Sequence, residues 1–379
     1  MEKAKSVVIL GLGRVGRAIG LDLSERYAVR AVDAYAAALQ QGKAAGIEVV
    51  DADATDHNAL VPIIEGADLV INALPGHLGF GVLKNVVESG KKVVDISFFP
   101  EDPFDLDDPA RSRGLVAVVD CGVAPGLSNM ILGSHCRLME IESFACYVGG
   151  LPKVRTWPYQ YKAPFSPVDV IEEYTRPARL VEHGQTVVRP ALSDPEHLEF
   201  EGIGTLEAFN TDGLRTLLRT VRVPNMKEKT LRYPGHSEYI RVLRETGFFS
   251  TEEIDVNGTK IAPVEFTARL LFPHWQPAEN EEEYTIMKIV IEGKEDGRAV
   301  TYTYDMADHF DKRTGLSSMA RTTGFTCAAV ASLVLDGRMP EVGILAPELI
   351  GMDRDSFDYV IDYLRSREIR LERSRAALN

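Results

Sequence analysis

The sequence predicts an α/β protein whose N-terminal part is a doubly wound parallel sheet, followed by an α+β domain. Three observations support this prediction. Short runs of Val and Ile alternate with helix-like segments up to residue 119. A Gly-x-Gly-x-x-Gly motif separates the first of these runs from the first helix. After residue 129 the alternation stops, and turn signals such as Asn257-Gly258 between strand-like segments predict hairpins.

Six short apolar segments have the composition of strands that are covered by helices on both faces, since they lack the alternation of a half-exposed strand. These strands are Val7–Leu10, Val29–Val32, Ile47–Val50, Leu69–Asn72, Val93–Ile96 and Leu115–Val119. Crossover helices are predicted over Arg14–Tyr27, from an N-cap at Thr55 to Ile64, and over Leu78–Ser89. Six strands with such crossovers imply a doubly wound parallel sheet.

The later part of the chain has the signals of an antiparallel or mixed sheet and of two helices. Ile141–Val148 is strand-like, and Tyr284–Ile291 and Ala299–Tyr304 flank a turn, which predicts a hairpin. The segment Ser318–Leu335 is apolar almost all round and predicts a buried helix. A further helix is expected over Ser356–Arg367, where apolar residues recur at helical spacing.

Composition narrows the class of protein. With 379 residues, 45% hydrophobic residues and a net charge of −14, the chain has the features of a globular protein without a nucleic-acid partner. None of the four cysteines forms a Cys-x-x-Cys pair, so we expect reduced, buried thiols and a cytoplasmic location. No signal peptide or membrane span is evident, and the eight scattered histidines predict no metal site.

The glycine motif predicts a dinucleotide site of the Rossmann type. Gly11 permits a tight turn, Gly13 lets the backbone approach a pyrophosphate, and Gly16 lets the helix pack on the strand. Asp33 ends the second strand, where an acid hydrogen-bonds the ribose and repels a 2′-phosphate, so NAD is favoured over NADP. Arg14 weakens that preference because it could partner a phosphate, and a scaffold without a nucleotide remains the alternative. The other expected cofactor contacts are Leu12, Val15, Asp53, Ala54, Asn72, Ala73, Leu74 and Pro75.

Several distant motifs resemble those of the saccharopine dehydrogenase/reductase-like superfamily, and most closely its L-lysine 6-dehydrogenases. They are "GVAPG" at Gly122–Gly126, "YVGGLP" at Tyr147–Pro152, "LEAFNTDG" at Leu206–Gly213, "LRYPGH" at Leu231–His236 and "MARTTGFT" at Met319–Thr326. The resemblance implies a Rossmann domain over residues 1–125 and an α+β substrate and subunit-contact domain over 126–317. It also implies C-terminal helices over 318–379 that pack back on the Rossmann domain, and a homodimer or higher assembly.

The resemblance further implies NAD(P)-linked oxidation of a carbon–nitrogen bond of an amino acid. One stretch departs from the family pattern. "DISFFPEDPFDLDD", from Asp95 to Asp108, stands where lysine dehydrogenases have a Gly/His-rich segment. The departure leaves the substrate open more than the reaction class.

Three residues are candidates for catalysis. An amine substrate needs a proton acceptor, and His236 follows a Pro-Gly turn within a matching motif. Tyr161 matches the family pattern, and Asp95 ends the fifth strand, at the edge of the sheet where ligands bind. The alternatives are a turn histidine satisfied by the backbone, a domain-interface aromatic and a turn-capping acid.

Four residues are candidates for substrate binding. Arg232 could clamp a carboxylate, with an interdomain ion pair as the alternative. Thr211 and Asp212 form a turn suited to lining a cleft, although they could also simply end a strand. His77 follows the fourth strand closely, and a surface loop histidine is its alternative.

We therefore expect an NAD(P)-dependent oxidoreductase acting on the CH–NH bond of an amino acid, of the L-lysine 6-dehydrogenase type. A saccharopine dehydrogenase or reductase is the nearest alternative, and it would need extra room and cations for the dicarboxylate arm of its secondary-amine substrate. An NAD-binding sensor without turnover is the alternative from another class.

Overall fold

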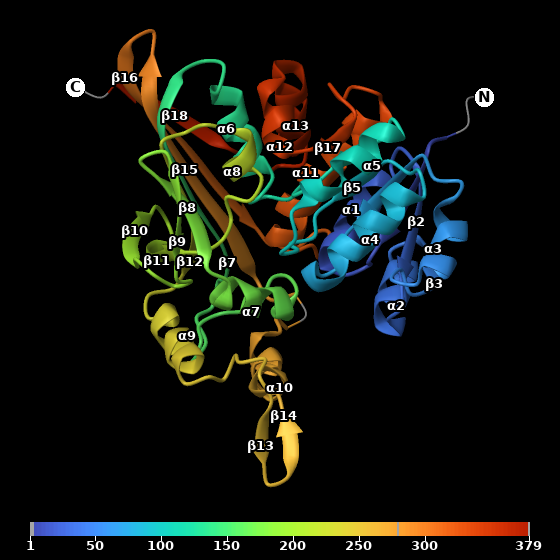
Figure 1. The fold of residues 1–379 in the computed structure, drawn as a ribbon, viewed down its shortest axis with the longest axis horizontal. Helices are drawn as coiled ribbons and strands as arrows, with labels where there is room; N and C mark the ends of the chain where they lie inside the picture. The colour runs from blue at the N-terminus through green and yellow to red at the C-terminus, as the bar shows by residue number, and fades with distance from the viewer. Residues whose placement is uncertain (1–3, 279, 378–379) are drawn as a thin grey trace. The chain divides into compact units, whose positions relative to one another are not determined.

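A computed structural model describes residues 4–278 and 280–377. The chain forms two compact units. The first unit comprises residues 1–139 and 320–370, and the second comprises residues 140–319 and 371–379. Each unit is described by itself below, and Figure 1 labels the elements of both.

The first unit contains a parallel sheet that, within the described residues, has seven strands in the order β17-β6-β5-β4-β1-β2-β3. The strands are β1 (Ser6–Leu10), β2 (Ala28–Asp33), β3 (Glu48–Asp51), β4 (Leu69–Asn72), β5 (Val93–Asp95), β6 (Val116–Val118) and β17 (Gly343–Leu345). Val8 of β1 pairs with Arg30 of β2 on one side and with Val70 of β4 on the other. This order reverses at β1, as in a Rossmann fold, so the predicted α/β class and parallel sheet are confirmed.

Helices connect these strands and cover the sheet. They are α1 (Arg14–Leu23), α2 (Ala36–Ala44), α3 (His57–Ile64), α4 (Gly76–Glu88), the 3-10 helix η1 (Pro103–Leu106), α5 (Asp107–Ser112) and α6 (Leu127–His135). The predicted N-cap Thr55 is wrong by one residue, because the Asp56 side chain accepts the hydrogen bond from Asn58 N. The first predicted helix is also too long, since α1 ends at Leu23 instead of Tyr27.

The C-terminal part of the chain completes this unit with elements that are orange to red in Figure 1: α11 (Ser318–Leu335), β17, α12 (Pro347–Met352) and α13 (Arg354–Ser366). β17 pairs with β6 in parallel, and no sequence signal predicted it. α12 packs against α6 so closely that a Cβ on Gly133 would lie 2.1 Å from Glu348 O. This contact keeps α6 in the first unit, so that unit extends to residue 139 rather than 125.

α11 is a core helix. By length and composition, it is the one helix among the described residues that could span a membrane, but 94% of it is buried inside the protein. Gly324 allows close packing, since a Cβ there would already lie 3.3 Å from Ala18 of α1. Burial in the protein core therefore accounts for its apolar sequence.

The second unit contains a mixed sheet with, in its described part, nine strands. Its main path has the order β10-β11-β12-β7-β15-β16-β18; off this path, β8 pairs with β12, and β9 pairs with β8. The strands are β7 (Glu140–Pro152), β8 (Ala178–Glu182), β9 (Gln185–Arg189), β10 (Glu196–Phe200), β11 (Gly204–Asn210), β12 (Asn225–Arg232), β15 (Glu283–Glu295), β16 (Arg298–His309) and β18 (Glu372–Ala377). The predicted hairpin is confirmed: β15 and β16 pair antiparallel around Asp296 and Gly297, which both have positive φ.

Among its described residues, the second unit also contains four helices and a separate hairpin. They are α7 (Pro167–Thr175), α8 (Leu217–Thr220), α9 (His236–Glu245), α10 (Pro263–Trp275) and the pair β13 (Ile254–Val256) and β14 (Thr259–Ile261). The turn at Asn257-Gly258 is confirmed, with φ of 55° and 85°. This hairpin and α10 extend away from the nine-stranded sheet (Figure 1).

Candidate functional sites

The glycine loop of the first unit has the geometry of a phosphate cradle. A Cβ on Gly11 would lie 2.7 Å from Ala73 O, and a Cβ on Gly16 would lie 2.0 Å from Gly11 O, so neither position accepts a side chain. At Gly13, in contrast, a Cβ would meet nothing within 4 Å. The open position lies at the N-terminus of α1, where unpaired N–H groups attract an anion. The loop therefore fits the pyrophosphate of a dinucleotide.

Asp33 lies at the end of β2, directly beside this loop. Its Oδ2 accepts a hydrogen bond from Leu12 N at 2.7 Å, and its Oδ1 accepts one from Tyr35 N at 2.8 Å. Two backbone donors thus fix the carboxylate at the place where a dinucleotide presents its adenosine ribose. Residues 34–38 contain no Arg or Lys that could partner a 2′-phosphate there.

The other predicted cofactor residues differ in their surroundings. Ala73 and Leu74 follow β4 and contact the glycine loop, since the Cβ position of Gly11 lies 3.2 Å from Leu74 Cδ2. Ala54 is a core residue, and the exposed Asp53 accepts hydrogen bonds from Thr55 N at 2.9 Å and Thr55 Oγ1 at 2.7 Å. Val15 is half-buried on α1, Arg14 is exposed, and Pro75 is the N-cap of α4.

Asp95 is fully buried at the end of β5 and is bound to its neighbours on both sides. Its Oδ1 accepts from Ser97 N at 2.6 Å, and its Oδ2 accepts from Asn72 Nδ2 at 2.6 Å. Asn72 Nδ2 also donates to Gly79 O of α4, at 3.0 Å. Burial raises the pKa of Asp95 to about 8, so this carboxyl holds a proton at neutral pH. The catalytic role of Asp95 stays a prediction, now with a defined protonation state.

His77 lies in the first turn of α4, and its side chain is exposed. It therefore lies shortly after β4, as expected. Its role in substrate binding stays a prediction.

In the second unit, the structure brings Arg232 and Tyr161 together around two residues that the sequence did not single out. The Arg232 guanidinium stacks on the Tyr161 ring with its Cζ 4.4 Å from the ring centroid. It donates from Nε to Tyr174 Oη at 3.0 Å and from Nη2 to Glu173 Oε2 at 2.8 Å. Arg232, Tyr161 and Tyr174 are buried, whereas the Glu173 side chain is 19% exposed.

His236 belongs to the same network as Arg232. Its Nδ1 lies 2.9 Å from Tyr159 O, which can only accept, so Nδ1 carries the proton and Nε2 accepts from Tyr174 Oη at 2.9 Å. Burial, together with the Arg232 charge, lowers the pKa of His236 to about 3. The ring is therefore neutral with both nitrogens engaged. This arrangement fits the positioning of Tyr174 better than proton transfer to a substrate.

Thr211 joins the network through Thr230, and Asp212 does not. Thr230 Oγ1 donates to Glu173 Oε1 at 2.9 Å and lies 2.9 Å from Thr211 Oγ1. Asp212 instead forms two hydrogen bonds with the Arg179 guanidinium, at 2.8 and 2.7 Å. Four of the predicted residues therefore converge on Glu173 and Tyr174 of α7.

The sequence contained one signal for α7. Ser166-Pro167 is a helix-start pattern, with the proline at the first helical position. That pattern locates the helix but does not reveal which of its side chains face Arg232.

Comparison with known proteins finds two protein-family domains that match this chain. The saccharopine dehydrogenase NADP binding domain matches residues 7–118, and the saccharopine dehydrogenase C-terminal domain matches residues 122–369. The chain belongs to the saccharopine dehydrogenase family. It is an oxidoreductase that acts on CH–NH groups of amino acids, which confirms the reaction class expected from the motifs.

Relatives within the family are distant. The saccharopine dehydrogenase [NADP(+), L-glutamate-forming] of Pyricularia oryzae is 25% identical over 90% of this chain and 93% of its own. The carboxyaminopropylagmatine dehydrogenase of Synechocystis is 24% identical over 77% of this chain and 76% of its own. The apo saccharopine dehydrogenase (L-Glu forming) of Saccharomyces cerevisiae superposes with a TM-score of 0.79 at 21% identity, covering 98% of this chain and 100% of its own.

The candidate residues of this saccharopine dehydrogenase family member are distributed over both matched domains. The NADP binding domain includes the glycine loop, Asp33 and Asp95, and the C-terminal domain includes Arg232 and His236. A bound nicotinamide dinucleotide would accept a hydride from the carbon that bears the amine. Within the described part of the chain, no group of three or more His, Cys, Asp or Glu side chains has the arrangement of a metal site.

Proposed function

We propose that this protein oxidises the CH–NH bond of a secondary amine that carries the carboxylates of an N-substituted amino acid. The observation behind the proposal is that relatives matched over most of their length are named for dehydrogenases of such amines, saccharopine and carboxyaminopropylagmatine. Oxidation gives an imine, which water hydrolyses to an amine and a carbonyl compound. The protein must therefore bind the amine unprotonated and hold its carbon against the nicotinamide.

We further propose that the hydride acceptor is NAD. The names of the matched domain and of the Pyricularia relative both mention NADP. The choice between NAD and NADP must therefore be argued from the residues of this chain. The Asp33 carboxylate is fixed by Leu12 N and Tyr35 N, and it would lie against the additional phosphate of NADP. A favourable interaction with the two ribose hydroxyls of NAD supports this cofactor.

A second candidate, oxidation of the ε-amine of lysine, is favoured by a different observation. The motifs from Gly122 to Thr326 also resemble those of L-lysine 6-dehydrogenases. Lysine lacks the second carboxylate arm, so the two candidates differ in the number of anionic groups that the site must accommodate.

An assay of cofactor reduction at 340 nm tests both candidates. Purified protein is incubated at alkaline pH with NAD or NADP and with saccharopine, carboxyaminopropylagmatine or lysine. We expect the largest kcat/KM with NAD and one of the two secondary amines. Turnover of lysine alone would replace the first candidate with the second, and no turnover of any amine would overturn both.

We also propose a homo-oligomer that assembles through the second unit. Two observations support it. The hairpin β13–β14 forms its own two-stranded sheet, and such a hairpin is marginal in water without a packing partner. The neighbouring α10 exposes Phe266 and Leu270, each 55% exposed, which are costly to leave in solvent.

A further inference from the structure

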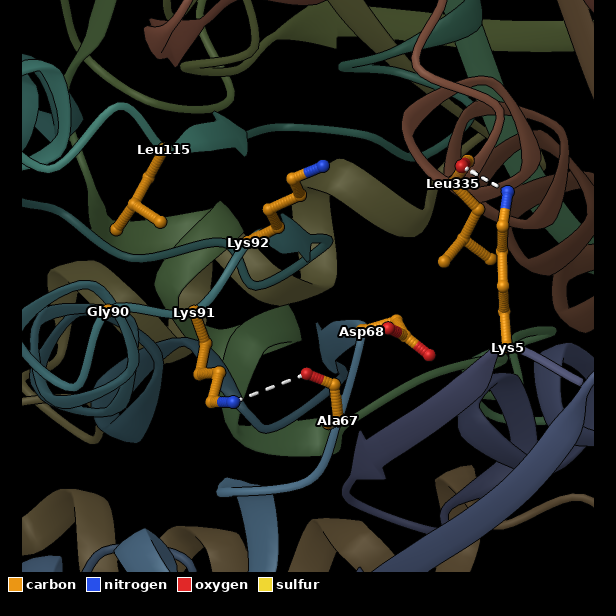
Figure 2. A pocket seen from close by; sticks show the side chains of 8 residues that line it. All are labelled: Lys5, Ala67, Asp68, Gly90, Lys91, Lys92, Leu115 and Leu335. Atoms are coloured by element: carbon orange, nitrogen blue, oxygen red, sulfur yellow. Dashed lines mark hydrogen bonds between the residues drawn. The ribbon is translucent and has the colours of Figure 1, made fainter. Parts of the chain in front are cut away.

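A cavity of about 400 Å³ lies at the edge of the first unit's sheet that is opposite to the glycine loop (Figure 2). Its lining residues precede the strands: Lys5 precedes β1, Asp68 precedes β4, Lys92 precedes β5 and Leu115 precedes β6. The strands are parallel, so the glycine loop, Asn72 and Asp95 lie at their other ends. This amino-edge cavity is therefore separate from the cofactor site.

Two of the three lysines in the cavity are held by the backbone. Lys5 Nζ donates to Leu335 O at 2.6 Å and lies 3.7 Å from Asp336 Oδ1. Lys91 Nζ donates to Ala67 O at 3.3 Å and also to Glu65 O. Their ammonium groups are thus fixed in place before any ligand binds, which lowers the entropic cost of binding.

The third lysine, Lys92, has its ammonium free for a ligand. No residue in the described part of the chain forms a hydrogen bond or ion pair with its Nζ. Figure 2 shows this group reaching into the space between Leu115 and Leu335. The side chain is only half-exposed, so an anion bound there would be partly shielded from water.

The cavity also contains one carboxylate, and this narrows the ligand class. Asp68 Oδ2 accepts from Ser6 N at 2.7 Å, while Oδ1 has no donor among the described residues. Inorganic phosphate would be attracted by the lysines and repelled by Asp68. A ligand that has a positively charged group in addition to its anionic groups would complement both Asp68 and the lysines.

Charge complementarity leads to one class of ligand. Three lysines, Asp68 and the Asp336 that pairs with Lys5 give a local net charge of +1. We propose that the amino-edge cavity binds an acidic amino acid, with its carboxylates on the ammonium groups of Lys92 and Lys5 and its α-ammonium on Asp68 (Figure 2). Leu115 and Leu335 provide apolar walls for the methylene groups. An acidic amino acid has two carboxylates and one ammonium group, so its net charge is −1. This charge balances the local net charge of +1 in the cavity.

Calorimetric titration of the full chain without cofactor tests the proposal, with L-glutamate, glutarate and inorganic phosphate as probes. We expect glutamate to bind best, and Lys92→Gln to weaken that binding by about tenfold or more, as loss of a charge-assisted contact should. The matched control is Lys84→Gln. Lys84 is an exposed lysine of α4 that pairs with Glu88 and does not line the cavity, so its loss should change nothing. Asp68→Asn should lower the affinity for glutamate to that for glutarate.

Hydrogen exchange locates the bound ligand, because glutamate could also enter a substrate site. Glutamate should protect amides in residues 65–69 and 90–93, and this protection should be lost in Lys92→Gln. No saturable binding of glutamate, equal binding by wild type and Lys92→Gln, or equal affinity for glutamate and phosphate would each overturn the proposal. The titration requires neither NAD nor turnover. A negative result would therefore not contradict the proposed dehydrogenase activity, which the assay at 340 nm tests separately.

Discussion

The Leu12 backbone N–H donates to the Asp33 carboxylate over 2.7 Å, and this single bond ties the middle of the glycine loop to the end of β2. The same carboxylate is the group expected to contact the ribose of the cofactor. Asp33 therefore shapes the loop, and under the proposed preference for NAD it is also the residue that would select between the two dinucleotides.

Asp33→Ser should weaken NAD binding and relax the discrimination against NADP. Loss of hydrogen bonds to a charged group costs about 1.5–3 kcal/mol, or roughly 10- to 100-fold in affinity. Kd values for NAD and NADP, measured by fluorescence titration, test this expectation. Glu25→Ser is the control, since that exposed acid lies beyond the C-terminal end of α1, at the opposite end of this helix from the glycine loop. An unchanged NAD/NADP ratio in Asp33→Ser would show that Asp33 does not select the cofactor.

The glycines of the loop should respond differently to the same substitution. Gly16→Ala places a Cβ 2.0 Å from Gly11 O, so the loop must distort and the melting temperature should fall. Gly13→Ala meets no protein atom within 4 Å, so stability should be kept while NAD affinity falls. Thermal melting with and without NAD separates the two effects. Full NAD affinity in Gly13→Ala would contradict the cradle.

Asp95 should make stability fall as pH rises from about 4 to about 8. Over that interval the native state keeps the proton that the unfolded carboxyl, with its ordinary pKa of 3.8, has already released. Asp95→Asn removes the titration, so its melting temperature should exceed that of the wild type by several degrees at pH 8 and by little at pH 4. Parallel pH curves for the two proteins would show that Asp95 is ionised in the native state.

His236→Gln tests whether His236 accepts a proton from the substrate or instead positions Tyr174. With the pKa of His236 at about 3, the ring is already neutral at every pH of an ordinary assay. We therefore expect the substitution to lower kcat/KM and stability, and to leave the shape of the pH–rate profile unchanged. Tyr174→Phe is the matched variant, because it removes the hydroxyl that joins His236 to Arg232. Loss of the acidic limb of the profile in His236→Gln alone would instead identify His236 as the proton acceptor.

The proposed oligomer should depend on the apolar face of α10. Phe266→Ser combined with Leu270→Ser should reduce the mass measured by light scattering to that of a smaller species. Val188→Ser, at a position 63% exposed on β9, is the control and should leave the mass unchanged. A wild-type protein that is already monomeric would exclude the proposed assembly.

Much of the first unit could be predicted because its signals are local. The strands β1 to β6 contain short runs rich in Val, Ile, Leu and Ala, and the glycine loop needs its residues at fixed spacing. β17 was missed because it has only three residues and pairs with a strand more than 200 positions away. Such a pairing leaves no periodicity in the sequence.

The network around Arg232 was predictable only in part. The motifs singled out Arg232, His236, Tyr161 and Thr211, because each lies in a recognisable segment. Glu173 and Tyr174 lie on α7, outside these motifs, and only packing in the second unit brings them against Arg232. The same limit explains Asp212, whose partner Arg179 belongs to another strand.

The first unit draws its last strand from residues 343–345, after residues 140–319 of the second unit have been translated. A ribosome that has released only residues 1–139 has produced six strands of the sheet, a strand β6 with an unpaired edge, and a helix α6 without α12. The glycine loop is thus translated among the first residues, yet its sheet is completed among the last. During synthesis the exposed edge of β6 is the place where premature pairing with another chain would begin.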